Sequence, residues 1–141
     1  MNVVVDASVV IAALMKDGRV RRVLLNPPED VVFHAPSMLD EEVRSCIPDI
    51  VIRTGKPHAE VESLIGDLLQ QLIFVPVALL EPRYDDAMRL SKAADAQDDA
   101  AYVAVALVLD APVWTLDDDF DRIGGIRRLR TRDFYPEPGA R

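Results

Sequence analysis

The chain has 141 residues, about the length of one domain, and its 50% hydrophobic and 28% charged residues exclude a disordered chain. One cysteine, Cys46, and two histidines exclude a disulfide scaffold and a four-ligand zinc finger. The formal charge of −8, from 24 acidic and 16 basic residues, argues against a general affinity for polyanions.

No stretch of the sequence is apolar enough to cross a membrane. The longest apolar run, Ala100 to Leu109, has ten residues, whereas a membrane-spanning helix needs about 20. The amino end lacks the basic start and the long apolar stretch of a secretory signal. We therefore expect a cytoplasmic protein without a membrane segment.

Apolar runs and amphipathic stretches alternate along the chain and predict alternating strands and helices. In chain order, the first predicted elements are a strand at Val3–Val5, a helix at Val9–Leu14, a strand at Val31–Ala35, and a helix that Ser37 caps and Pro48 kinks or ends. The later elements are a helix at Val61–Leu72, a strand at Ile73–Val75, helices at Pro82–Ala94 and Ala100–Leu109, a strand at Val113–Leu116 and an edge strand at Arg128–Arg130. The continuous apolarity of Ala100–Leu109 predicts a buried helix, and Tyr135–Arg141 is expected to be a frayed tail.

This alternation predicts an α/β fold. Strand–helix–strand units imply right-handed crossovers and a three-layer α/β/α sandwich around a four- to five-stranded, mainly parallel sheet. The sequence has no internal repeat and no linker, so residues 1–141 are expected to form a single domain. Because ligand sites in such sheets lie beyond the carboxyl ends of the strands, candidate residues should follow the strands.

Acidic residues occupy those positions. Asp6 ends the first strand and Asp117 follows a later one, so both are expected at the same edge of the sheet. Glu42 lies about one turn into the helix after the second strand, and Asp98 and Asp99 precede the buried helix. Several carboxylates in one cleft repel each other unless a cation neutralises them. Oxygen ligands without clustered His or Cys favour Mg²⁺ or Mn²⁺ over zinc, and such an ion can promote hydrolysis of a phosphodiester.

Four short segments carry these acids. They are Val3-Val4-Val5-Asp6-Ala7-Ser8, Pro36-Ser37-Met38-Leu39-Asp40-Glu41-Glu42-Val43, Asp99-Ala100-Ala101-Tyr102-Val103-Ala104 and Val113-Trp114-Thr115-Leu116-Asp117-Asp118-Asp119-Phe120. None is specific alone, but the four occur in order across nearly the whole chain. Together they resemble the motifs of the PIN-domain ribonucleases, the fold of VapC-type toxins of toxin–antitoxin pairs.

The resemblance implies a metal-dependent endoribonuclease that uses Mg²⁺ or Mn²⁺ and is the toxin of a toxin–antitoxin pair. The implied catalytic and metal-binding acids are Asp6, Glu42, Asp99 and Asp117, and the secondary candidates are Ser8, Thr115, Asp98 and Asp119. The resemblance also implies an RNA substrate, a small antitoxin partner and a homodimer.

Each candidate also has a purely structural interpretation. Asp6 can cap the helix that follows it, and Glu42 and Asp99 can each interact with a helix dipole. Hydroxyl groups at strand ends commonly just satisfy backbone groups. Three arginines near the carboxyl end can contact RNA phosphates or only blunt an edge strand with charge; they are Arg127, Arg128 and Arg130.

Two other classes of protein stay open at this point. A PIN-fold module that binds RNA or protein without cleaving would share the same motifs, and only a cleavage assay separates it from a nuclease. A haloacid-dehalogenase-type phosphatase is disfavoured because Asp6-Ala7-Ser8 lacks the second aspartate of an Asp-x-Asp motif. A phosphoaspartyl receiver usually needs a lysine after a late strand, and the only lysines are Lys16, Lys56 and Lys92.

Overall fold

A parallel sheet lies at the centre of the structure, a computed structural model that describes residues 1–135. Within these residues it has five strands: β1 (Asn2–Val5), β2 (Val32–Pro36), β3 (Leu72–Val75), β4 (Val113–Trp114) and β5 (Arg128–Leu129). Their order across the sheet is β3-β2-β1-β4-β5, and every neighbouring pair is parallel. The predicted parallel sheet is therefore confirmed, with β1 at its centre.

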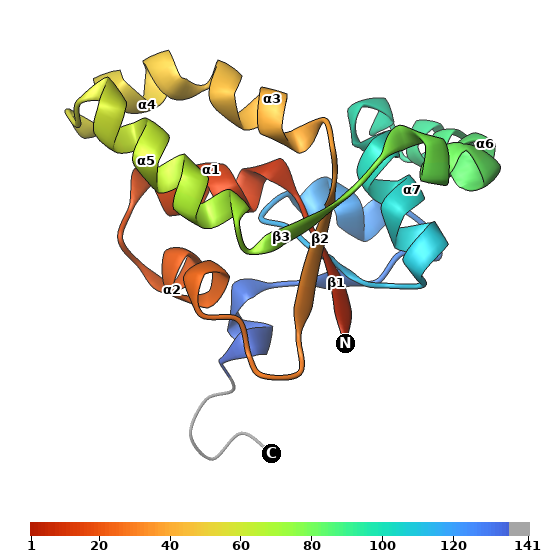
Figure 1. Cartoon of the computed structure of the whole chain (residues 1–141). Helices are drawn as coiled ribbons and strands as arrows, with labels where there is room; N and C mark the ends of the chain where they lie inside the picture. The colour runs from red at the N-terminus through yellow and green to blue at the C-terminus, as the bar shows by residue number, and fades with distance from the viewer. Residues whose placement is uncertain (136–141) are drawn as a thin grey trace.

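Helices cover both faces of this sheet. The helices are α1 (Ala7–Met15), α2 (Arg19–Leu25), α3 (Leu39–Ser45), α4 (Ile47–Thr54), α5 (His58–Leu69), α6 (Val77–Ala93) and α7 (Ala100–Leu109), with short 3₁₀ turns η1 (Gln97–Asp99), η2 (Asp118–Arg122) and η3 (Thr131–Phe134). Figure 1 shows α1 to α5 on one side of the strands and α6 and α7 on the other. This arrangement confirms the predicted three-layer α/β/α sandwich.

Several helix boundaries differ from the sequence prediction. The helix α2 was missed, although Val23 and Leu24 on it are buried. Ser37 does not cap α3: the residue before that helix is Met38, which makes no side-chain capping bond. Pro48 lies in the first turn of α4, so the chain breaks just before it at Cys46 and then resumes as a helix. A proline is tolerated in a first turn because its missing N–H has no partner there.

Two further boundaries differ between the sequence prediction and the structure. Helix α6 begins at Val77 rather than at Pro82, which lies inside the helix. There Pro82 lacks the N–H that would bond the carbonyl of Ala78, a loss that packing against α7 outweighs. The fourth strand ends at Trp114 instead of Leu116. The predicted tail, apart from Tyr135, lies outside the described residues.

The core lies between the sheet and its two helical layers. Helix α7 is buried along most of its length, from Ala100 to Ala106, which confirms the prediction made from its apolarity. Its small alanine side chains let it pack closely on β1, β2 and α6. On the sheet, Trp114 is 0% exposed, with its ring 5.4 Å from that of Phe33 and 4.8 Å from that of Phe134. The rigid core therefore holds both the start of α7 and the end of β4.

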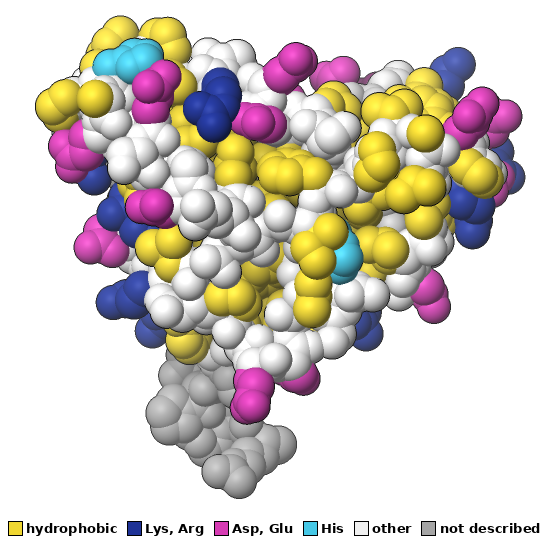
Figure 2. Space-filling model, viewed as in Figure 1, with side chains coloured by type: hydrophobic (Ala, Val, Ile, Leu, Met, Phe, Trp, Pro, Cys, Tyr) yellow, Lys and Arg dark blue, Asp and Glu magenta, His cyan; other side chains and the backbone are white. Residues whose placement is uncertain are grey.

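Some apolar side chains remain on the surface. Figure 2 shows hydrophobic side chains on the face that Figure 1 presents, over the β3 edge of the sheet and over α6. Ile73 on β3 is 54% exposed, and Val77 and Leu79 on α6 are about equally open. No helix within residues 1–135 has the length and apolarity needed to span a membrane.

Candidate active site

The four acids implied by the motifs come from different elements and lie around the carboxyl ends of β1, β2 and β4. Asp6 follows β1 directly, and its backbone N–H donates to the carbonyl of Trp114 at the end of β4, at 3.0 Å. Asp117 begins the turn η2 beyond β4. Glu42 lies on α3 after β2, and Asp99 is the last residue before the buried helix α7.

Asp6 is held by the two hydroxyl groups that the motifs singled out. Its Oδ2 atom accepts a hydrogen bond from Ser8 Oγ at 2.6 Å and another from Thr115 Oγ1 at 2.9 Å. It also accepts from the backbone N–H of Ser8 at 3.4 Å, so Asp6 caps α1 as well. No hydrogen bond from residues 1–135 reaches Oδ1. The carboxylate is thus fixed through one oxygen. Asp6 can therefore cap α1 and still act as a residue of the candidate active site.

The same hydroxyls also order the segment that carries Asp117. Thr115 Oγ1 accepts from the backbone N–H of Asp117 at 3.0 Å, and Ser8 Oγ accepts from that of Leu116 at 3.2 Å. The two hydroxyl oxygens lie 3.3 Å apart. Each hydroxyl therefore donates to Asp6 and accepts from the chain after β4. They satisfy backbone groups, as the structural interpretation expected, and they also couple two of the candidate acids.

The carboxyl group of Asp99 has a raised pKa. Burial, followed by the negative charges of Asp6 and Asp117 and then of Asp119 and Asp98, raises the pKa of Asp99 to about 7. Its side chain makes no capping bond to α7, so a helix cap does not explain its position. Because Asp6, Asp117, Asp119 and Asp98 each contribute to this rise, the acids lie near enough to act on one another electrostatically.

Glu42 has a partner that the sequence analysis missed. The hydroxyl of Tyr102, on α7, donates to Glu42 Oε1 at 3.2 Å. Burial raises the pKa of Glu42, the bond from Tyr102 partly lowers it, and the negative charges of Asp6 and Asp98 raise it. Tyr102 is only 1% exposed. The sequence did contain a signal for this contact. Tyr102 is a single tyrosine in an otherwise aliphatic helix, three residues after Asp99, and a buried phenol needs a hydrogen-bond partner.

The secondary acids occupy the margin of the site. Asp98 is exposed, and its charge contributes to the raised pKa values of Glu42 and Asp99. Asp119 is half-buried, and its backbone N–H donates to Asp117 Oδ1 at 2.9 Å. Its own carboxylate accepts from Arg122 at 2.8 Å. Asp119 therefore orders Asp117 through the backbone while its side chain is paired.

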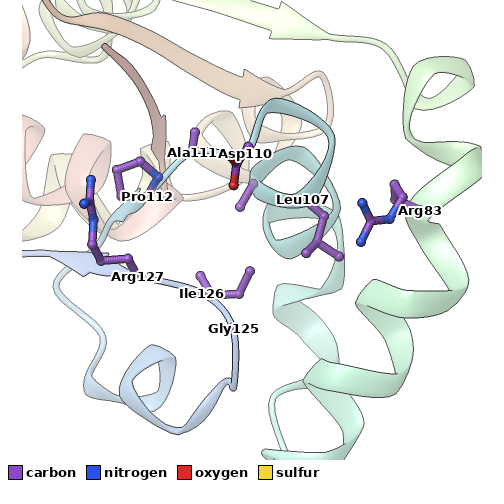
Figure 3. Close-up of a pocket in the computed structure, with 9 residues that line it drawn as sticks. Arg83, Leu107, Asp110, Ala111, Pro112, Gly125, Ile126 and Arg127 are labelled. Carbon is purple, nitrogen blue, oxygen red and sulfur yellow. The ribbon is translucent and has the colours of Figure 1, made fainter.

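The three arginines proposed for RNA contact have different surroundings. The Arg128 side chain is 6% exposed and donates to the carbonyl of Thr115 at 3.1 Å and to Asp118 at 2.8 Å. Arg130 pairs with Asp121 at 3.2 Å. Arg127 is exposed and lines a cavity of about 480 Å³ together with Pro112 (Figure 3). Pro112 directly precedes β4, whereas Asp117 follows that strand, so this cavity lies at the other end of the strands from the acids. The structure brings none of the three to the acids as a free cation.

The residues present have the donor chemistry that a hard divalent ion needs. Each of the four acids offers carboxylate oxygens, as Mg²⁺ and Mn²⁺ prefer. Burial and neighbouring negative charge raise the pKa values of Glu42 and Asp99, and such an ion would neutralise that charge. Within residues 1–135, no three Asp, Glu, His or Cys side chains lie close enough to hold an ion as they stand. The acids would have to draw together to bind one.

Comparison with known proteins identifies the family. The model of the PIN domain family matches residues 4–135 of the chain. The chain belongs to the PIN domain family. The resemblance drawn from the four motifs is thereby confirmed, and the match includes every candidate acid of this PIN domain.

A solved structure agrees in fold. The chain is similar to the crystal structure of VapBC2 from Rickettsia felis bound to a DNA fragment from the VapBC2 promoter, with a TM-score of 0.73. The match covers 92% of this chain and 98% of the other, at 14% sequence identity. At that identity the likeness shows the fold alone. No curated protein matches the sequence.

Proposed function

We propose that this PIN domain is a metal-dependent endoribonuclease that hydrolyses RNA phosphodiester bonds. The observation that carries the proposal is that the partly buried Asp99 lies near enough to Asp6 and Asp117 for their charges to add to the effect of burial, and together these raise its pKa to about 7. A protein gains nothing in stability from gathering unneutralised carboxylates at one edge of a sheet. Their retention is understandable if a divalent cation occupies the site during function.

Asp6, Glu42, Asp99 and Asp117 would hold Mg²⁺ or Mn²⁺, directly or through water. When bound, such an ion supplies Lewis-acid chemistry, lowering the pKa of a water molecule and stabilising charge on the phosphate oxygens. Hydrogen bonds from neighbouring residues restrain the side chains of Asp6, Glu42 and Asp117.

Three neighbouring side chains orient two of these acids. Ser8 and Thr115 hold the Asp6 carboxylate through Oδ2, and Tyr102 holds Glu42. Burial and neighbouring charge raise the pKa of Tyr102, so its hydroxyl stays protonated and remains a donor. Positioning of this kind typically changes metal affinity or activity by about 10- to 100-fold.

The test is incubation of the purified protein with structured and single-stranded RNAs in the presence of Mg²⁺, Mn²⁺ or EDTA. We expect cleavage with either ion and none with EDTA. Cleavage that persists in EDTA would contradict the proposed chemistry. The same RNAs with 2′-deoxy substitution at the cut site show whether the 2′-hydroxyl takes part.

We further propose that the protein is the cytoplasmic toxin of a toxin–antitoxin pair, with a small antitoxin partner and a homodimeric state. The support is family membership and the fold shared with a VapBC2 assembly. Expression of this chain alone should arrest bacterial growth, and co-expression of a small protein encoded immediately upstream should restore it. Unimpaired growth with the soluble, RNA-cleaving protein would contradict the toxin role.

The second candidate function is a PIN-fold module that binds RNA or protein without cleaving it. The observation in its favour is that no ready metal site exists within residues 1–135. Such a module would bind RNA equally well with and without metal and would cut none of the RNAs. The cleavage assay therefore separates the two candidates directly.

A further inference from the structure

A pocket away from the acids is lined by basic side chains. Its volume is about 520 Å³, and Lys16, Arg19, Arg22 and Arg132 contribute four cations to its wall. These four residues define what we call the cationic pocket. Lys16 follows α1, Arg19 and Arg22 lie on α2, and Arg132 lies on η3, so segments far apart in sequence build it. Figure 2 shows Lys and Arg side chains along the left edge of the molecule, beside the position of α2 in Figure 1.

The cations of this pocket differ from most others in the protein. Among residues 1–135, eight arginines form ion pairs with carboxylates: Arg21, Arg44, Arg53, Arg83, Arg89, Arg122, Arg128 and Arg130. Within residues 1–135, none of the four cations of the cationic pocket does so. The one acid on the pocket wall, Asp17, lies 3.9 Å from Arg21. The pocket is therefore a local positive surface on a chain whose formal charge is −8.

The backbone around the cationic pocket is fixed. Arg21 on α2 is mostly buried, and its Nε donates to the carbonyl of Ala13 on α1 at 2.7 Å. Thr131, which precedes Arg132, accepts a hydrogen bond from the fully buried Trp114 at 3.1 Å. Helix α2 and η3 are in contact. The cations therefore project from rigid elements, which reduces the entropy lost when they bind a ligand.

Helix α1 links this pocket to the candidate active site. Asp6 immediately precedes α1 and Lys16 immediately follows it. A nine-residue helix is about 14 Å long at 1.5 Å per residue. That separation corresponds to a few nucleotides along a strand. The acids repel phosphate groups, so a strand that reaches them needs positive charge elsewhere on its path.

We propose that the cationic pocket binds the phosphodiester backbone of the RNA, a few nucleotides from the bond that is cut. This inference rests on the proposed ribonuclease function and adds the surface that holds the substrate. Lysine and arginine contacts to phosphate supply most of the sequence-independent affinity for nucleic acid. Arg19 and Arg22 lie three positions apart on α2 and therefore share one face of that helix.

The test measures binding of a fluorescein-labelled single-stranded RNA by fluorescence anisotropy, in EDTA to prevent cleavage, over a series of NaCl concentrations. The variant Arg19→Gln/Arg22→Gln removes two exposed cations of the pocket. The matched control, Lys56→Gln/Lys92→Gln, removes two cations that line no part of it and form no ion pair within residues 1–135. Duplex DNA of the same sequence is a second probe.

We expect the pocket variant to bind the RNA about tenfold or more weakly, with the slope of log affinity against log salt reduced by about 1.4 for two lost contacts. In cleavage assays with Mn²⁺ its KM should rise by a similar factor while kcat stays unchanged, as expected when ground-state and transition-state binding fall equally. The control variant should behave as the wild type in both assays.

Equal affinity and slope for the pocket and control variants, with normal RNA binding by the wild type, would overturn the cationic pocket as an RNA site and leave the nuclease proposal standing. A loss confined to duplex DNA would assign the pocket to DNA and likewise overturn the proposal. If the wild type neither binds nor cleaves RNA, the proposed function itself fails, and the inference fails with it.

Discussion

Replacing Asp99 by asparagine should stabilise the metal-free protein, because it removes a carboxylate that is partly buried and repelled by the neighbouring acids. Burial and neighbouring negative charge raise the pKa of Asp99 from 3.8 to about 7 in the folded state. At full strength this change corresponds to about 4 kcal/mol of lost stability above neutral pH. Asp99 is only half-buried, so solvent screening reduces our expectation to about 1–2 kcal/mol.

The direction of the stability change and its pH range follow from the pKa values of Asp99 in the unfolded and folded states. Because the folded state holds the proton more tightly than the unfolded state, the wild type loses stability as pH rises from about 4 to about 7. Below that window Asp99 is neutral in both states and resembles asparagine. The advantage of Asp99→Asn should therefore be absent near pH 4 and complete at pH 8, where it corresponds to about 3–8 °C in Tm.

Thermal unfolding followed by circular dichroism in EDTA, between pH 4 and pH 8, measures this effect. Asp67→Asn serves as the control, because Asp67 is an exposed acid on α5 that does not contribute to the pKa of Asp99. Saturating Mn²⁺ should raise the Tm of the wild type more than that of Asp99→Asn. An Asp99→Asn variant that is no more stable than the wild type at pH 8 would show that the Asp99 carboxylate does not destabilise the folded protein.

Three other substitutions test the supporting contacts. Tyr102→Phe removes the donor that lowers the pKa of Glu42, so the acid limb of the pH–rate profile should move to higher pH; an unchanged limb would argue against a role for Glu42. Thr115→Val removes a hydrogen bond to Asp6 and should lower kcat by about 10- to 100-fold with an unchanged circular dichroism spectrum; full activity would show that this bond is dispensable. Trp114→Ala empties a fully buried position and should cost about 3–5 kcal/mol in urea unfolding; a cost below about 1 kcal/mol would contradict the packing described.

The sequence predicted the sheet and the buried helix because their signals are local. Short apolar runs such as Val3–Val5 and the unbroken apolarity of Ala100–Leu109 lead directly to β1 and α7. Helix α2 escaped prediction because its seven residues include three arginines and only a short apolar stripe. The start of α6 was misplaced because Pro82 suggests a helix start, whereas contact with α7 sustains the helix on both sides of it.

The candidate acids could be predicted because each follows an identifiable strand or precedes an identifiable helix. The contacts that position them could not, since Ser8 and Thr115 are 107 residues apart and meet only through the pairing of β1 with β4. The partnership of Tyr102 with Glu42 likewise depends on the packing of α7 against the site. For Arg128 the sequence suggested a contact to RNA phosphate, but the structure shows its side chain bonded to Asp118 and to the carbonyl of Thr115.

The acids at this edge of the sheet are proposed to perform metal-dependent cleavage of RNA. The most direct test compares single-turnover cleavage of one RNA by the wild type, Asp6→Asn and Asp67→Asn at saturating Mn²⁺, with circular dichroism to verify that each is folded. We expect Asp67→Asn to cleave at the wild-type rate and folded Asp6→Asn not to cleave. Cleavage by Asp6→Asn at a rate close to that of the wild type would contradict this proposal.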